Sequence, residues 1–152
     1  MLFRSLKHTT EYTYDENNNV ASKTDANKAC WTYSYDECNQ LIETSSPKTK
    51  VCRYHNGTLI EEYRSVKTQN TYDSFGNLTS VIRDAEGSKQ TIQYTYDVNN
   101  QKTATIYPDV MVNKAERKAS AERQEEKKTL SDTLAYNAFG DIISSTDRKS
   151  VV

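Results

Sequence analysis

The segment Asn70-Thr-Tyr-Asp-Ser-Phe-Gly-Asn-Leu-Thr-Ser-Val-Ile-Arg-Asp-Ala-Glu-Gly87 has the pattern of two strands joined by a tight turn and followed by a second turn. Gly76 can adopt a positive φ without steric cost, as a short hairpin loop requires. The carboxylate of Asp73 can accept hydrogen bonds from backbone N–H groups two or three residues later, which fixes the loop entry. Residues 78–83 then form the return strand, and residues 84–87 reverse the chain again.

The same pattern recurs along most of the chain. The second tyrosine of each copy stands at positions 14, 35, 54, 72, 96 and 136. The first five positions are 18 to 24 residues apart, and the last interval of 40 residues has room for two copies. The repeat is carried by Tyr14, Asp15, Tyr35, Asp36, Leu41, Tyr72, Asp73, Gly76, Asn77, Leu78, Tyr96, Asp97, Tyr136, Gly140 and Ile142. A period of about 20 residues indicates an array of two-stranded units.

At these positions the chain resembles the RHS/YD-repeat family, the shell proteins of the RHS toxin, Tc-toxin and teneurin type. The family unit looks like Tyr-x-Tyr-Asp-x-x-Gly-Asn/Arg-Leu, then a short strand and an Asp-x-x-Gly turn. The copy from Tyr72 to Gly87 matches it almost position for position. In other copies Asn18, Asn39 or Asn99 replaces the glycine, and asparagine also tolerates a left-handed conformation. The resemblance covers roughly residues 12–109 and 134–148.

The repeat and the resemblance together predict an all-β fold. We expect an antiparallel meander of about six YD-repeat hairpins that forms a curved sheet or an open segment of a β-shell. Residues 1–109 would be the hairpin array, residues 110–130 a charged helical insertion, and residues 131–152 a further repeat. The helix is expected because residues 114–128 are rich in charged residues and alanine and contain no Gly or Pro.

The composition limits the possible classes of protein. Hydrophobic residues make up only 35% and the mean hydropathy is −0.89, which argues against a dense aliphatic core. Eleven tyrosines and a net charge of −1 argue against disorder. The same net charge gives no electrostatic case for nucleic acid or an anionic membrane. No stretch approaches the ~20 apolar residues of a membrane span, and the first residues lack the apolar run of a signal peptide.

No motif indicates catalysis, a cofactor or a metal. The aspartates that follow the repeat tyrosines stand where turns need them, and no carboxylate pair is placed in a cleft. Cys30, Cys38 and Cys52 are odd in number and form no Cys-x-x-Cys, so neither a disulfide framework nor a zinc site is indicated. Large members of the family resembled carry a self-cleaving core with an Asp-Pro motif. This sequence contains no Asp-Pro, so that activity is not carried over.

The resemblance implies a non-enzymatic scaffold, a fragment or short paralogue of a hollow shell that encapsulates or presents a cargo or toxin polypeptide. Neighbouring YD repeats of a larger shell are further expected partners, the isolated chain should associate with itself, and a secreted or cell-surface location is implied only by the resemblance. The alternative is a surface adhesin or carbohydrate-binding module. Trp31, Tyr33 and Tyr35 share one face of a strand and could stack on sugar rings. Exposure of this patch would favour the module, and burial under a neighbouring repeat would favour the shell.

Overall fold

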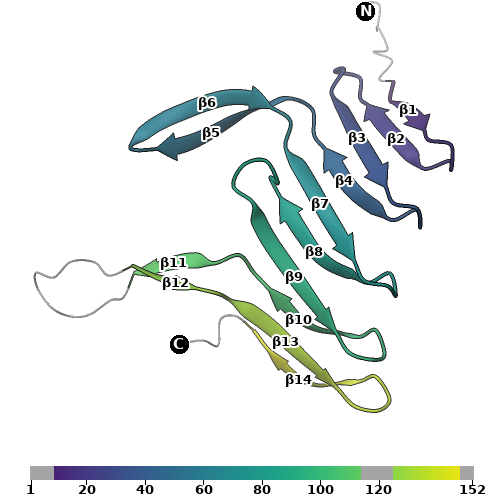
Figure 1. Cartoon of the computed structure of the whole chain (residues 1–152), viewed down its shortest axis with the longest axis vertical. Coiled ribbons are helices and arrows are strands. Elements are labelled where there is room, and N and C mark those ends of the chain that lie inside the picture. Colours follow the sequence, from purple (N-terminus) through teal and green to yellow (C-terminus); the bar gives the residue numbers. More distant parts are fainter. Residues whose placement is uncertain (1–8, 114–124, 148–152) are drawn as a thin grey trace, which may run out of the picture. The chain divides into compact units, whose positions relative to one another are not determined.

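The computed structural model describes residues 9–113 and 125–147, and every regular element in them is a strand. The strands are β1 (Glu11–Tyr14), β2 (Val20–Thr24), β3 (Cys30–Tyr35), β4 (Leu41–Ser45), β5 (Thr49–His55), β6 (Thr58–Arg64), β7 (Lys67–Tyr72), β8 (Leu78–Arg83), β9 (Gln90–Tyr96), β10 (Lys102–Ile106), β11 (Val110–Asn113), β12 (Glu125–Lys128), β13 (Ser131–Tyr136) and β14 (Ile142–Thr146). Ten strands form one antiparallel sheet in the order β1-β2-β3-β4-β7-β8-β9-β10-β13-β14 (Figure 1). The sheet is not closed, because β1 and β14 each have a single neighbour among the described strands. The prediction of an all-β, open hairpin array is confirmed.

The hairpin of β5 and β6 lies outside the ladder of repeats. Its tip is the Asn56-Gly57 turn, and the positive φ values of 49° and 77° at these residues are those of a type I′ turn. However, β5 pairs only with β6, while β4 pairs directly with β7. The array therefore contains five YD hairpins where the sequence suggested about six, and Tyr54 is not a repeat tyrosine.

A second separate hairpin corrects the predicted helix over residues 110–130. Both ends of that range are strands: β11 pairs with β12, from Val110 opposite Lys128 to Asn113 opposite Glu125. Cross-strand pairing overrides the helix propensity of the charged residues, which is only a weak preference. The middle of the predicted helix, residues 114–124, lies outside the described residues. Since β10 pairs directly with β13, the described part of the 40-residue interval adds the β11–β12 pair and no further strand to the main sheet.

We predict that the β11–β12 arm is dispensable for the sheet. Replacing residues 111–128 with a short Gly/Ser loop keeps the β10–β13 pairing and the bond from the Tyr107 N–H group to the Leu130 carbonyl (2.8 Å). The β content in circular dichroism and the melting temperature should therefore stay close to those of the parent. Thr105→Pro is the control, because proline removes an N–H donor from the central strand β10 and should melt the sheet. A loss of several degrees in the loop variant would contradict the prediction.

The chain divides into two compact units, each with its own repeats. The first contains residues 1–71 and 82–89, and the second contains residues 72–81 and 90–152. Of the side chains whose exposure is described, none is buried in either unit. The absence of an aliphatic core, expected from the composition, holds for this part of the chain. Contacts between neighbouring strands and within turns must therefore supply most of the stability.

The strands of each unit alternate in exposure. In β3, Trp31, Tyr33 and Tyr35 are half-buried, while Cys30, Thr32 and Ser34 between them are exposed. This period of two places the aromatic side chains on one face and the small polar side chains on the other. All three cysteines are free and exposed. No helix of the length and hydrophobicity of a membrane span occurs among residues 9–113 and 125–147.

Candidate functional site: the YD loops and their tyrosines

Five loops of the same length join the two strands of each YD hairpin. We call them the YD loops and number their positions 1 to 5; they comprise residues 15–19, 36–40, 73–77, 97–101 and 137–141. In every loop the N–H group of position 1 donates to the carbonyl of position 5, and the N–H group of position 4 donates to the carbonyl of position 1. The ten distances lie between 2.9 and 3.1 Å. The repeat therefore specifies one turn geometry, which all five YD loops share.

The side chain at position 1 holds the loop from within. The Oδ1 atom of Asp73 accepts hydrogen bonds from the N–H groups of Phe75 and Asn77, both at 2.9 Å. The aspartates at 15, 36 and 97 bind their loops in the same way, at 2.8 to 2.9 Å. In the fifth loop the amide oxygen of Asn137 accepts the corresponding two hydrogen bonds. Position 1 thus needs an oxygen acceptor on a short side chain, and a negative charge is not essential.

Sequence reasoning missed one more loop of this kind. Asp25 accepts hydrogen bonds from the N–H groups of Asn27 and Ala29, and its backbone repeats the bonding of the YD loops. This loop connects β2 to β3. The only available sequence signal was Asp25 itself, because the left-handed residue three positions later is Lys28 (φ 65°), a type that does not favour this conformation.

Position 4 of every YD loop is left-handed. Its φ is 65° at Asn18, 61° at Asn39 and Asn100, 86° at Gly76 and 87° at Gly140. Asn100, rather than the expected Asn99, therefore takes the place of glycine in the fourth loop. Asparagine and glycine are the residues that adopt this conformation at least cost, which explains why only these two types occur at position 4.

The second tyrosine of a repeat reaches back to the preceding hairpin. The hydroxyl of Tyr96 donates to the carbonyl of Leu78 (2.9 Å), and that of Tyr35 donates to the carbonyl of Val20 (3.2 Å). Tyr136 donates in the same way to Lys102 (2.9 Å). Each acceptor is the first residue of the return strand of the preceding hairpin. These bonds link consecutive repeats through side chains as well as through the backbone ladder.

The chemistry of Tyr96 suits the donor role. Burial raises the pKa of its phenol above the ordinary value of 10.0, and the nearby Tyr94 and Asp73 act in the same direction. The hydroxyl therefore keeps its proton at neutral pH and remains a donor to the Leu78 carbonyl. Tyr96 is half-buried, whereas Tyr14, in the edge strand β1, is 61% exposed to solvent.

The aromatic patch of β3 is partly covered by neighbouring side chains. The Nζ atom of Lys23 lies 5.8 Å from the centre of the Trp31 ring, directly opposite it across β2 and β3. Tyr35 has its hydroxyl bound to Val20, and Trp31, Tyr33 and Tyr35 are all half-buried. Stacking of a ligand on Trp31, Tyr33 and Tyr35 stays a prediction.

A cluster of charges fixes the turn between β8 and β9. An Nη2 atom of Arg64 lies 2.6 Å from the Asp84 carboxylate, and Lys67 lies 2.8 Å from Glu86. The N–H group of Ser88, which binds the Asp84 carboxylate, lowers the pKa of that carboxyl below its ordinary value, and Arg64 adds to the effect. The left-handed residues of this turn are Asp84 and Lys89, with φ of 53° and 49°. Gly87 is not one of them.

Gly87 is favoured for a different reason. A Cβ atom there would collide with the guanidinium of Arg64 and the carboxylate of Asp84. The Asp-x-x-Gly turn is thus defined by the close approach of an ion pair to the backbone. Arg64 belongs to β6 of the separate hairpin, so this ion pair ties the base of that hairpin to the turn.

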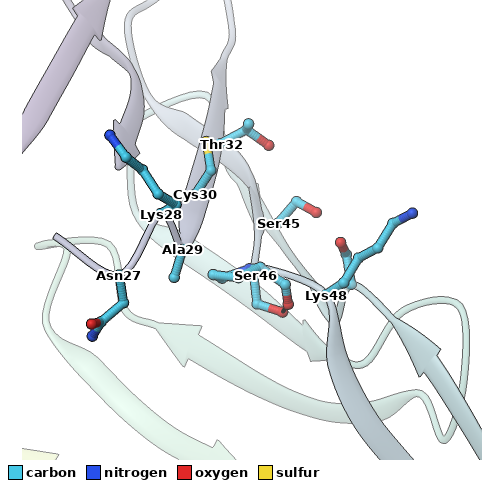
Figure 2. A pocket seen from close by; sticks show the side chains of 10 residues that line it. Asn27, Lys28, Ala29, Cys30, Thr32, Ser45, Ser46 and Lys48 are labelled. Carbon is cyan, nitrogen blue, oxygen red and sulfur yellow. Dashed lines mark hydrogen bonds between the residues drawn. The ribbon is translucent and has the colours of Figure 1, made fainter. Parts of the chain in front are cut away.

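A hollow beside β3 is lined mostly by small polar side chains and two lysines. It has a volume of about 560 Å³ and opens to solvent, and Figure 2 shows the side chains around it. Its lining includes Lys28, Lys48 and Cys30, together with serines, Thr32 and Asn27, but no carboxylate and no imidazole. The amino groups of the two lysines point away from each other in Figure 2. Within the described residues, no group of three His, Cys, Asp or Glu side chains could hold a metal ion.

The YD loops should make stability depend on pH. The side-chain amide of Asn77 lowers the pKa of Asp73 below its ordinary value of 3.8. At Asp15 burial acts to raise the pKa, but the hydrogen bonds from Asn19 and Asn17 outweigh it, and the pKa is again lowered. A carboxyl group whose pKa is lowered in the folded state stabilises the fold at pH values above its ordinary pKa. This contribution is lost as the pH falls through the folded-state pKa.

We therefore expect a melting temperature that is nearly constant from pH 7 to 5 and falls as the pH drops below about 4. Asp73→Asn is the variant that removes the charge: its amide oxygen can accept the two backbone bonds as that of Asn137 does, although the Asn77 amide loses its acceptor on residue 73. It should remove part of the acid dependence and keep the loop. A melting temperature that stays level down to pH 2.5 would contradict the prediction.

The comparisons with known proteins match the repeat hairpins of the chain. The family described as RHS Repeat matches residues 14–51 and 71–109, which together make up half of the chain. Most of the β5–β6 hairpin falls between the two matches, in agreement with its place outside the ladder. The curated proteins give no match.

Three solved structures are similar at low identity. They are described as crystal structures of TcdB2-TccC3-Cdc42, TcdB2-TccC3-TEV and TcdB2-TccC3, with identities of 18%, 16% and 14% and TM-scores of 0.35, 0.33 and 0.35. The matches cover 89%, 89% and 95% of this chain but only 9%, 9% and 10% of theirs. The chain thus spans about a tenth of the length of the proteins it matches.

Proposed function

Because this chain belongs to the RHS repeat family, we propose that it is a structural segment of a β-shell that encloses or presents a cargo or toxin polypeptide, without catalysis of its own. The repeats themselves have a structural role. The residues of the Tyr-Asp pattern form loops and bonds between hairpins, and their polar atoms are largely occupied by these contacts. Asp73, for example, uses both carboxylate oxygens within its own loop.

The observation that carries the proposal is the incompleteness of each hairpin. Tyr35, Tyr96 and Tyr136 each need the preceding hairpin for their hydroxyl bond. No side chain of described exposure is buried, so a hairpin gains its stability from its neighbours, as in other repeat proteins. Among the described strands, the outer strands β1 and β14 each lack one such neighbour. A sheet built in this way suits a segment of a longer array whose continuation covers both edges.

A chimera tests the proposal. The five YD hairpins of this chain would replace five consecutive hairpins of a longer RHS-repeat protein that forms a closed shell. Electron microscopy would report whether the shell closes, and digestion by a protease would report whether the enclosed polypeptide is protected. We expect closure and protection. A soluble, folded chimera with an open shell, whose cargo is digested as fast as the free polypeptide, would contradict the proposal.

Two controls accompany the chimera. The same graft carrying Gly76→Val should lose closure, because that loop needs a left-handed residue at φ 86°. A screen of the isolated chain against carbohydrates examines the alternative function. Binding of a glycan that is lost in Trp31→Ala would favour a carbohydrate-binding module over the shell.

A further inference from the structure

Consecutive YD loops touch each other through the side chains at positions 5 and 4. The amide of Asn19, at position 5, donates to the Oδ1 atom of Asn39, at position 4 of the next loop (2.8 Å). In the second compact unit, Asn77 donates in the same way to Asn100 (2.9 Å). The Nδ2 group of each donor also binds the aspartate at position 1 of its own loop, at 3.2 and 3.0 Å. One amide group thus connects two loops.

A second arrangement occurs where position 5 is glutamine. The side chain of Gln101 is one methylene longer than asparagine, and its Nε2 atom lies 2.8 Å from the point that a Cβ atom on Gly140 would occupy. Gly140 stands at position 4 of the next loop. The glutamine therefore fills the space that an asparagine side chain would need there, and only glycine fits beside it without displacing it.

The two arrangements alternate along the sequence. Position 5 and the following position 4 are Asn19 and Asn39, Gln40 and Gly76, Asn77 and Asn100, and Gln101 and Gly140. In three of these pairs both residues belong to the same compact unit, and these pairs make the contacts described above. The pair of Gln40 and Gly76 follows the pattern in residue type alone. Asparagine is followed by asparagine and glutamine by glycine in all four.

We infer that position 5 of one YD loop and position 4 of the next form a matched pair, either Asn with Asn or Gln with Gly, that selects which hairpins can lie side by side. Both kinds of mismatch weaken the contact between neighbouring loops. Asparagine facing glycine leaves its amide without the acceptor on the next loop, and glutamine facing asparagine meets a side chain where it needs free space. The inference rests on the loop contacts and does not depend on the shell function.

The rule also describes the hairpin that fits the open edge at β1. Asn18, at position 4 of the first loop, has no side-chain hydrogen bond among the described residues. Its complement is a YD hairpin whose loop ends in asparagine, because the amide of that residue can donate to the Asn18 Oδ1 atom as Asn19 does to Asn39. A hairpin ending in glutamine is excluded there.

Exchange of one pair type for the other tests the inference. In the full chain, Asn39→Gly and Asn19→Gln would each create a mismatch, and the double variant would recreate the pair formed by Gln101 and Gly140. The readout is hydrogen exchange of the amides in loop 36–40. Each single variant should lower their protection about fivefold, the effect of one hydrogen bond. The double variant should return to within about twofold of the parent, because the longer side chain again faces a glycine.

Asn18→Gly is the matched control, since it makes the same change at position 4 of a loop with no described neighbour on that side. It should leave the protection of its own loop unchanged. The inference is overturned if the losses of the two single variants add in the double variant, or if neither single variant has an effect. The double variant Gln101→Asn with Gly140→Asn makes the opposite exchange, from a Gln–Gly pair to an Asn–Asn pair. It replaces the variants at positions 19 and 39 if those fail to fold.

Discussion

Gly76→Val is expected to lower the free energy of unfolding by on the order of 1–3 kcal/mol, the largest loss from a single change in a YD loop. Gly76 has φ 86°, where a β-branched side chain clashes with its own backbone. Its N–H group also donates to the Asp73 carbonyl (3.1 Å), so the backbone cannot leave this conformation without losing a bond of the loop. Urea denaturation of the parent and the variant measures the difference.

Gly76→Asn is the control for this prediction. Asparagine stands at the same position in three other YD loops, with φ of 61° to 65°. It should therefore cost much less than valine. Equal midpoints for Gly76→Val and the parent would show that the loop does not need a left-handed residue.

Gly87→Ala should cost less than Gly76→Val. Its backbone is not left-handed, but an added Cβ atom would displace the ion pair of Arg64 and Asp84. Both partners are side-chain ends that can turn toward solvent, and partly exposed ion pairs contribute little.

The isolated chain is expected to form oligomers whose mass rises with concentration. The outer strands β1 and β14 have one neighbour each in the described sheet, and their free N–H and C=O groups can recruit other strands. Every residue of β14 is exposed, including Ile142 at 59% and Ile143 at 65%. A net charge of −1 provides almost no repulsion between copies. Size-exclusion chromatography with light scattering measures the mass.

Ile143→Lys tests the edge as the cause, because an added charge on an outer strand opposes edge-to-edge pairing. It should shift the distribution toward the monomer. Ser74→Lys adds the same charge to a YD loop, away from both outer strands, and should change the distribution much less. A single peak near 17.4 kDa at high concentration of the parent, with cooperative unfolding, would mean that the sheet caps itself. The carbohydrate-binding module would then become the better reading.

The local structure of the repeats could be predicted from residue types. The loop at residues 73–77, the type I′ turn at Asn56-Gly57 and the alternation of β3 all depend on side chains and dihedral angles within a few residues. An aspartate oxygen and a left-handed residue three positions later are sufficient to close a YD loop. The prediction failed by one residue at Asn100, since two adjacent asparagines satisfy the same pattern.

The role of each strand in the sheet was decided by contacts that are distant in sequence. The pattern of β5 and β6 is that of a good hairpin, yet β4 pairs with β7 across the 21 intervening residues 46–66 and leaves this hairpin outside. The charged residues of β12 favour a helix by propensity, but pairing with β11 makes them a strand. The space at Gly87 is limited by Asp84 of the same turn and by Arg64, which comes from another hairpin.

The sequence by itself determined that the chain is a set of β-hairpins with a common loop, because hydrogen bonds within five residues suffice to form that loop. The tertiary structure alone decided which hairpins are neighbours and which project from the sheet. The physical reason is that each strand offers the same backbone N–H and C=O groups to any other strand. The choice between partners therefore depends on side chains that meet only after folding, such as Tyr96 at Leu78 and Asn77 at Asn100.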